Sequence, residues 1–538
     1  MSDPLYLQKE YRTANEPKIH PIIRRKTRSS FVFVPSAGMR LAPELLILEF
    51  MREVFFEQHY GNITTKARQL DPEERNEEGI NSFSKQQRAI LYVLKGRRKQ
   101  TKNSNDQKYF APAYPHLAEN AWFRKNSERV VNNFLLSGPI AQHIGYNKHG
   151  SKDKKQRQQE LIEKIYHALL GGNSCLDKEL KGKEILAAAL GPESFSAYKD
   201  PNLSLKNLKQ KTSTPELNSL ISIENDELAD RITFDLESIC DLEPKLPRMQ
   251  WLQLLMTFLR FALPMWLLAQ MQITRHIHYW LIKATDKKLL PDYDEIRTKL
   301  ANRNRKLLHP TLTPTRELFE HIDGYMKCRV ELNILLYCLN ETKKCETDFI
   351  NDEIMLNLDG RENGWIGIEE LLLIMREAAC EISKMERFNQ VAKGHNIQTF
   401  LTREGEQFSS WRNPRKSGVG KNIDEFFRVL YRAEKGDESG GFLLTPEGQG
   451  AARGFKVFPG QLLLKTMTFL AAKNKWSGQG TGTGMLVLQD VEDHFAQYGI
   501  DFSNAADARP LLMEKLQSMG LLKGSPDAGS SVAVACPY

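Results

Sequence analysis

The sequence predicts a mainly α, multidomain protein in which a helical body is followed by a smaller α+β domain at the C-terminal end. Apolar side chains recur three and four residues apart through much of residues 246–434, which is the spacing of helices that bury one face. The chain has 538 residues. Several domains are expected because single hydrophobic cores stop growing near about 250–300 residues. No repeat with a period of about 20–50 residues is present, which argues against a solenoid.

Changes in polarity and in glycine and proline content divide the chain into four expected domains. They are a basic N-terminal domain (1–150), a mixed helical and linker region (151–245), a central helical domain (246–440) and a C-terminal domain (441–538). In the second region, residues 160–172 are expected to form an amphipathic helix that ends at two glycines. Further amphipathic helices are expected over 313–342, 365–388 and 422–434.

Residues 251–271, WLQLLMTFLRFALPMWLLAQM, are almost long enough and apolar enough to cross a bilayer. The stretch also contains Arg260 and Pro264, and a charge at mid-span costs about 2.5–3.5 kcal/mol on insertion scales. A helix that is apolar all round is also typical of the centre of a large soluble domain. We therefore expect a buried core helix here, and no membrane partner.

The seven cysteines are scattered along the chain without a C-x-x-C pair, so the sequence indicates neither a zinc site nor a disulfide framework. The first thirty residues carry charges and prolines where a secretory signal peptide would need an apolar core. We expect a cytoplasmic protein that needs no metal and no other cofactor.

Positive charge is concentrated in the first quarter of the chain. The formal net charge is +8, and residues 1–150 hold 24 Lys and Arg against 15 Asp and Glu, so the other residues sum to about −1. Two basic runs stand beside expected strands or helices: Arg24, Arg25, Lys26 and Arg28, and then Lys95, Arg97, Arg98 and Lys99. Such runs can follow a phosphate backbone, with release of a counterion for each phosphate that is neutralised. We expect nucleic acid, DNA rather than RNA, to bind here; a solvated charged face is the alternative.

The last hundred residues carry an ordered series of expected elements. A helix over 458–475 and the apolar strand MLVL are followed by a helix over 490–498, a turn and a third helix for which Asp507 can act as the N-cap. A strand, a turn and a strand end the chain. This order resembles a winged-helix domain, a relative of the helix-turn-helix.

The charge of this C-terminal domain favours protein docking over DNA binding. Residues 440–538 hold eight basic and eight acidic side chains, whereas DNA binding draws on an excess of positive charge. The expected anchors for another protein subunit are Arg509, Lys515 and Tyr538.

The segment LANRNRKLLHPTL contains Arg303, Asn304 and His309. An Arg, a polar residue, four further residues and a His is the pattern of the HEPN superfamily, small helical domains many of which are ribonucleases, and this segment resembles it. The resemblance implies metal-independent cleavage in which His309 transfers a proton and Arg303 stabilises charge on the phosphate. Arg316 and His321 fit the same loose spacing, and a basic turn before a proline is the alternative reading.

Two functions from different classes are therefore expected. The first is a non-enzymatic, nucleic-acid-associated subunit of a multi-protein DNA-processing or phage-defence assembly, with nucleic acid on the basic N-terminal region and a partner on the winged helix. The second is a HEPN-type ribonuclease that uses Arg303 and His309. Asp235, Glu243 and Lys245 also form a carboxylate, carboxylate and lysine set of the kind that holds Mg²⁺ in nucleases, although their spacing is short.

Overall fold

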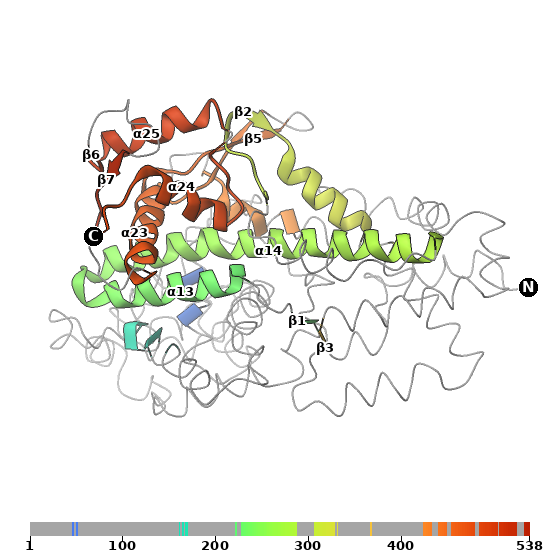
Figure 1. The fold of residues 1–538 in the computed structure, drawn as a ribbon, viewed down its shortest axis with the longest axis horizontal. Coiled ribbons are helices and arrows are strands. Elements are labelled where there is room, and N and C mark those ends of the chain that lie inside the picture. Colours follow the sequence, from blue (N-terminus) through green and yellow to red (C-terminus); the bar gives the residue numbers. More distant parts are fainter. Residues whose placement is uncertain are drawn as a thin grey trace, which may run out of the picture.

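The structure is a computed structural model of the chain, and it describes about a third of the residues. The described residues are 46–47, 50–51, 161, 164–165, 167–169, 221–222, 227–287, 306–328, 331, 366–367, 423–424, 426–432, 440–448, 453–478, 484–503, 505–523 and 532–538. This part is mostly helical with small sheets, as predicted (Figure 1). The helix expected over 365–388 is wrong at its start, where β3 (Ile366–Gly367) pairs in parallel with β1 (Ile221–Ser222). The rest of that segment lies outside the described residues, as do the basic runs and most of the first two expected domains.

Two helices form a hairpin at the centre of the described part. α13 (Glu227–Leu242) leads through the short helix η5 (Glu243–Lys245) into α14 (Arg248–Lys287) (Figure 1). Proline restricts the backbone of the residue before it, and the run PKLP stands at this turn. The guanidinium of Arg248 donates hydrogen bonds to the carbonyls of Ala168 (2.7 Å) and Leu169 (2.6 Å). These carbonyls belong to helical residues within 161–169, and a hydrogen bond from a charged donor is stronger than one between neutral groups.

α14 is the core helix expected from its composition. Its stretch Arg248–Gln272 is long enough and apolar enough to cross a membrane, but the apolar 18-residue window within it is 89% buried inside the protein. Arg260 lies 3% exposed within it and donates hydrogen bonds to the carbonyls of Val429 and Tyr431. The charge is therefore satisfied by main-chain oxygens at η6 (Arg428–Leu430) and its C-cap, which is how a buried guanidinium is tolerated.

A three-stranded antiparallel sheet joins distant parts of the chain. Its order is β2 (Thr311–Thr315), β5 (Gly454–Val457) and β4 (Leu444–Glu447). The helix predicted over 313–342 is therefore wrong at its start, and helix begins only at residue 317. The sequence TLTPT alternates β-branched threonines, which suit a strand, and its proline is tolerated because β2 is an edge strand.

The C-terminal elements follow the expected order. They are α23 (Gln461–Gly478), α24 (Leu488–Gln497), α25 (Ala508–Ser518), β6 (Leu522–Lys523) and β7 (Ala533–Val534). β6 pairs with β7, and Val487 forms an antiparallel bridge with Ala533. The chain just before α24 therefore lies alongside this small sheet and pairs with it at one residue.

Asp507 stands at the N-cap position of α25, as predicted, but its side chain does not cap the helix. Instead its carboxylate accepts hydrogen bonds from the main-chain N of Leu312 (2.8 Å) and the hydroxyl of Thr311 (3.2 Å). These bonds lower the pKa of Asp507, and the carboxylate ties the start of α25 to β2.

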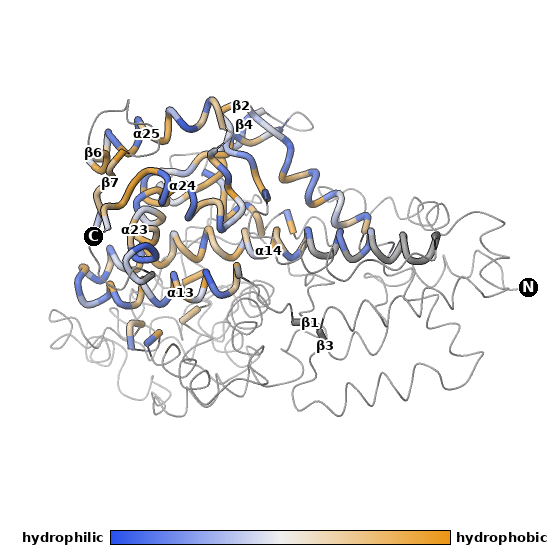
Figure 2. Tube along the Cα trace, viewed as in Figure 1, coloured by the Kyte–Doolittle hydropathy of each residue, from blue (hydrophilic) through white to orange (hydrophobic). Residues whose placement is uncertain are grey.

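The C-terminal elements and the helical hairpin share one hydrophobic core. The ring of Phe261 on α14 lies 5.1 Å from that of Tyr498 and 6.1 Å from that of Phe495. The carbonyl of Gly499 accepts hydrogen bonds from the main-chain N of Leu307 (2.9 Å) and Leu308 (3.3 Å). Figure 2 shows hydrophobic residues along α14 and in the C-terminal elements that cover it. Core contacts thus cross the boundary predicted at 440/441, and the division into four domains stays a prediction.

Candidate functional site

Asp235 lies in a buried polar cluster between α13 and α24. Its side chain has no exposed surface, and it accepts a hydrogen bond of 2.6 Å from the hydroxyl of Tyr498. His494 Nε2 lies 3.1 Å away and Arg231 Nη1 3.7 Å away. Burial and the neighbouring Asp235 carboxylate raise the pKa of Tyr498, so the phenol keeps the proton that it donates. The cluster therefore joins two helices of the core.

The reading of Asp235, Glu243 and Lys245 as a magnesium site is wrong. Asp235 is enclosed by the cluster above, and Glu243 is 1% exposed with Oε1 3.6 Å from the Arg248 guanidinium. Within the described part of the chain, no group of three His, Cys, Asp or Glu side chains could hold a metal ion.

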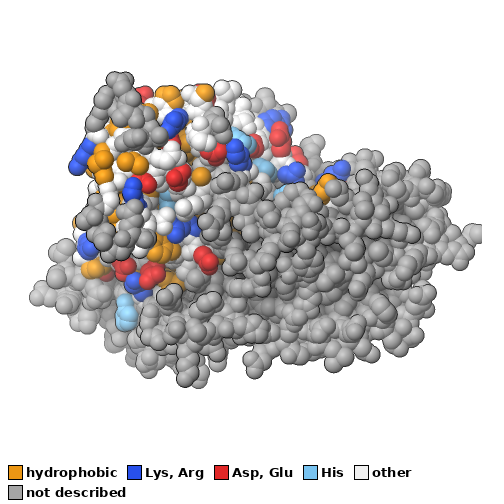
Figure 3. Space-filling model, in the orientation of Figure 1, with side chains coloured by type: hydrophobic (Ala, Val, Ile, Leu, Met, Phe, Trp, Pro, Cys, Tyr) orange, Lys and Arg blue, Asp and Glu red, His pale blue; other side chains and the backbone are white. Residues whose placement is uncertain are grey.

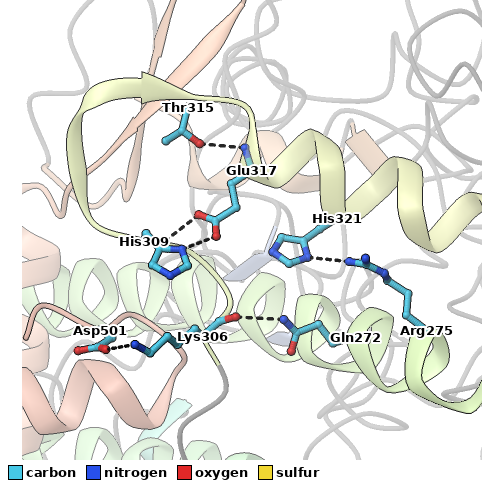
Figure 4. Close-up of polar contacts among 8 residues, drawn as sticks. All are labelled: Gln272, Arg275, Lys306, His309, Thr315, Glu317, His321 and Asp501. Carbon is cyan, nitrogen blue, oxygen red and sulfur yellow. Dashed lines mark hydrogen bonds and ion pairs between the residues drawn. The ribbon is translucent and has the colours of Figure 1, made fainter. Parts of the chain in front are cut away.

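His309 is the centre of an exposed polar site beside β2. It lies in the extended segment before the strand, and its main-chain N donates a hydrogen bond of 2.8 Å to Glu317 Oε2. Its Nδ1 lies 2.5 Å from Glu317 Oε1. The main-chain N of Glu317 in turn donates to the hydroxyl of Thr315 (2.9 Å), at the start of the helix over 317–328. Main-chain and side-chain contacts thus fix the carboxylate against the imidazole (Figure 4).

This His309–Glu317 pair has the geometry of an oriented proton acceptor. A carboxylate at Nδ1 favours the tautomer with its hydrogen on that nitrogen, which leaves Nε2 as the basic atom. Figure 4 shows the second ring nitrogen pointing away from Glu317, and 57% of the side chain is exposed. A substrate hydroxyl could therefore approach Nε2, as general base catalysis requires.

Two cationic residues and a second histidine lie in the same region as the pair (Figure 4). Lys306 Nζ lies 3.0 Å from Asp501 Oδ2. The main-chain carbonyl of Lys306 accepts a hydrogen bond from the side chain of Gln272 on α14 (3.0 Å). Burial opposes the charge on Asp501, but hydrogen bonds from Ser503 and Lys306 lower its pKa to about 2. The carboxylate is therefore ionised at neutral pH and forms an ion pair with Lys306.

His321 lies one helical turn after Glu317, and its Nδ1 lies 3.4 Å from Arg275 Nη1. Burial lowers the pKa of His321, with the Arg275 charge acting in the same direction and the Glu317 charge opposing both. The imidazole of His321 is therefore neutral at neutral pH, because burial and the neighbouring guanidinium both disfavour a positive charge on it.

The sequence found only part of this site. Arg303 and Asn304, the other residues of the HEPN-like motif, lie outside the described residues, so their distance from His309 is untested. Glu317 and Arg275 were missed: Glu317 stands inside RELFEH without a spacing that marks it, and Arg275 comes from α14. The eight basic residues expected to bind nucleic acid, which are Arg24, Arg25, Lys26, Arg28, Lys95, Arg97, Arg98 and Lys99, also lie outside the described residues.

The expected docking anchors are half-buried rather than exposed. The guanidinium of Arg509 donates two hydrogen bonds to the carboxylate of Glu492, from Nε (2.6 Å) and Nη2 (3.1 Å), and Glu492 is 3% exposed. The ring of Tyr538 lies 5.8 Å from that of Phe469, and burial raises the pKa of Tyr538. Lys515 stands on α25 with part of its side chain in solvent.

The solvent-facing side of α25 is close to neutral. The exposed side chains of α25 are Pro510, Glu514, Gln517 and Ser518. Figure 3 shows acidic, basic and hydrophobic side chains interspersed over the described face of the C-terminal elements.

The chain matches no protein-family model, and comparison with curated proteins and with solved structures finds no similar protein.

Proposed function

We propose that this chain is a non-enzymatic, nucleic-acid-associated subunit of a multi-protein DNA-processing or phage-defence assembly. In this proposal the basic N-terminal region holds nucleic acid, and the C-terminal domain is a winged helix that docks another protein subunit. The observation that favours a protein partner over DNA is the paired hydrogen bonding of Arg509 to Glu492, which withdraws the arginine of the third helix from phosphate contacts and also from its expected role as an anchor.

The order of elements supports the winged-helix assignment. Three helices, α23, α24 and α25, precede the hairpin of β6 and β7, and Val487 pairs with this hairpin from the chain before α24. In helix-turn-helix relatives the helix at the position of α25 enters the major groove of DNA. Function resides in the site and not in the fold, so a helix at this position can contact a protein partner when its charge does not favour phosphate.

The charge of α25 supports a protein partner. A DNA-reading helix presents Arg, Lys, Asn or Gln to base edges and is flanked by cations that neutralise phosphates. On α25, Arg509 is committed to Glu492, and Glu514 projects a negative charge beside Lys515. Docking interfaces also draw on few anchors, and a neutral, mixed surface has no electrostatic conflict with a protein partner.

Duplex binding by the full chain tests the docking role. We expect the double variant Lys515→Glu/Lys523→Glu, which changes the net charge by four, to bind a short duplex within about twofold of the unaltered protein. Lys523 is exposed on β6 and Lys515 faces solvent in part, so neither reversal disturbs the core. A loss of tenfold or more, with a salt dependence flattened by about 0.9 per lost contact, would make α25 and the hairpin the DNA-binding surface.

The full chain is required for this experiment. Phe261 of α14 packs against rings of α24, so a fragment that begins at residue 441 would expose an apolar face of its own helices. Point substitutions at the surface separate DNA binding from folding, whereas deletion of the C-terminal domain removes part of the shared core.

A ribonuclease is the second candidate function, and the His309–Glu317 pair is the observation that favours it. In this function Nε2 of His309 accepts the proton of a ribose 2′-hydroxyl, and the 2′-oxygen attacks the adjacent phosphorus. The bond from phosphorus to the 5′-oxygen breaks, which leaves a 2′,3′-cyclic phosphate and a 5′-oxygen that takes a proton from water. Glu317 acts as a positioning residue because its carboxylate holds the imidazole from Nδ1. The resemblance to the HEPN superfamily implies that Arg303 stabilises the charge on the phosphate.

Under this second function, the purified full chain cleaves single-stranded RNA in the presence of EDTA. We expect His309→Ala to lower the cleavage rate about 10²–10⁴-fold, the range of general acid or base catalysis. Glu317→Gln should lower it less and shift its pH profile, since a neutral amide orients the ring without a charge. His167→Ala, which changes an exposed histidine of another helix, is the matched control. Equal rates for His309→Ala and the unaltered protein, or no cleavage at all, would exclude this function.

A further inference from the structure

Arg453 is a half-buried arginine that lies against two aromatic rings and has no acidic partner. It stands two residues before Phe455 of β5, and its guanidinium carbon Cζ lies 5.5 Å from the centre of the Phe455 ring and 5.2 Å from that of Tyr431. Its Nε is buried without a hydrogen-bond partner, and within the described part of the chain its guanidinium forms no ion pair. The rings attract the cation, but its N–H groups still need acceptors.

A second arginine stands beside the same tyrosine. The Tyr431 hydroxyl donates a hydrogen bond of 3.4 Å to Asp424 Oδ1, and Nη2 of Arg428 donates one of 3.3 Å to Asp424 Oδ2. The Nε of Arg428 is also buried without a partner, while 28% of its side chain is exposed. Tyr431 thus links the two arginines, because Arg453 lies over its ring and Arg428 shares the carboxylate that accepts its hydroxyl.

The Arg453 cluster, which consists of Asp424, Arg428, Tyr431 and Arg453, carries an excess of one positive charge. Both arginines are permanently protonated, and Asp424, which is 6% exposed, is the one carboxylate of the cluster. Burial and the Asp424 charge raise the pKa of Tyr431 well above its usual value, although both guanidinium charges act to lower it, so the phenol is neutral. A half-buried cation without a counterion is costly, and an anion bound here would remove that cost.

We propose that the Arg453 cluster binds the terminal phosphate group of a small molecule, with Arg453 and Arg428 as the donors. A phosphate presents more acceptor oxygens than a carboxylate, and a guanidinium fork can bind two of them at once. One phosphate can therefore satisfy N–H groups of both arginines. The rings of Tyr431 and Phe455 already hold Arg453 in place, so less side-chain freedom is lost when the ligand binds.

The surroundings of the two arginines favour a compact ligand. Asp424, Tyr431 and Phe455 are all buried, so the guanidinium groups are the parts of the site that a ligand can reach. A terminal phosphate needs only such a small contact area, whereas a nucleic-acid strand binds through a row of cations. The proposal is independent of the two functions above, because it involves none of the residues assigned to nucleic acid, docking or RNA cleavage.

Calorimetric titration of the full chain with inorganic phosphate at low ionic strength tests the proposal. We expect one phosphate to bind with a Kd of about 1 mM or tighter. Acetate, which has two acceptor oxygens, should bind at least about tenfold more weakly. No saturation by about 10 mM phosphate would overturn the proposal, and equal affinities for acetate and phosphate would overturn the assignment to a phosphate group.

Variants assign the binding to the two arginines. Arg453→Leu keeps an apolar contact with the rings, and Arg428→Gln leaves Arg453 in place; each should weaken phosphate binding at least about tenfold. Lys456→Gln is the matched control, because it removes a cation of the same strand that is paired with Glu447, and it should stay within about twofold. Unfolding midpoints identify the variants that are folded. Unchanged binding in a folded arginine variant, or an equal loss in Lys456→Gln, would overturn the proposal.

Discussion

Asp235→Ala is expected to lower the free energy of unfolding by about 3–5 kcal/mol, the usual cost of removing one partner from a buried ion pair. The substitution leaves the Tyr498 hydroxyl and the His494 imidazole without the carboxylate that lies 2.6 and 3.1 Å from them. It also leaves the Arg231 charge, whose side chain is 17% exposed, without its neighbour on α13. Each of these groups has lost water on folding, so its desolvation is no longer compensated.

Denaturant unfolding of the full chain measures this effect. Asp230→Ala, which changes an exposed carboxylate on the same helix, is the matched control and should stay within about 0.5 kcal/mol. A double-mutant cycle of Asp235→Asn with Tyr498→Phe then isolates the hydrogen bond between α13 and α24. Equal midpoints for Asp235→Ala and Asp230→Ala would show that the buried cluster does not hold the C-terminal helices on the hairpin.

The parts of the fold that the sequence predicted are those set by local pattern. The run from residue 251 to residue 271 is apolar on every side, and α14 buries it as expected. β2 was missed because its pairing partner, β5, lies far along the chain, and the apolar spacing of the helix that follows extends back into the strand. Local spacing cannot reveal a long-range pairing, and tertiary contact overrides propensity at such boundaries.

The same limit applied to two histidine pairs. Spacing identified His309, but Glu317, which orients it, and Arg275, which lies beside His321, come from a different segment and a different helix. His276 and His278 are two residues apart, which on a helix directs their side chains to different faces, so their spacing predicts no shared site. The partner of His278 is Glu331, which only the packing of the next helix brings to it.

Charge reversal in the two basic runs is expected to have the largest effect on nucleic-acid binding. The variant Arg24→Glu/Arg25→Glu/Lys26→Glu with Arg97→Glu/Arg98→Glu/Lys99→Glu removes six potential phosphate contacts. The slope of log affinity against log salt should then flatten by about 5, at about 0.9 per contact, and affinity near 0.15 M salt should fall at least about a hundredfold. The effect should be similar for duplexes of unrelated sequence, because phosphates carry no sequence information.

The most direct test of the proposed function compares two variants that alter the net charge equally. Arg97→Glu/Arg98→Glu and Lys515→Glu/Lys523→Glu each change it by four, so any difference reports the position of the nucleic acid rather than the total charge. Duplex affinity of the full chain is measured for both from about 0.05 to 0.3 M salt. The N-terminal pair should lose affinity with a slope smaller by about 2, and the C-terminal pair should match the unaltered protein. The reverse result, or no effect of either pair, would contradict a subunit that holds nucleic acid at its N-terminal region and docks a partner at its C-terminal domain.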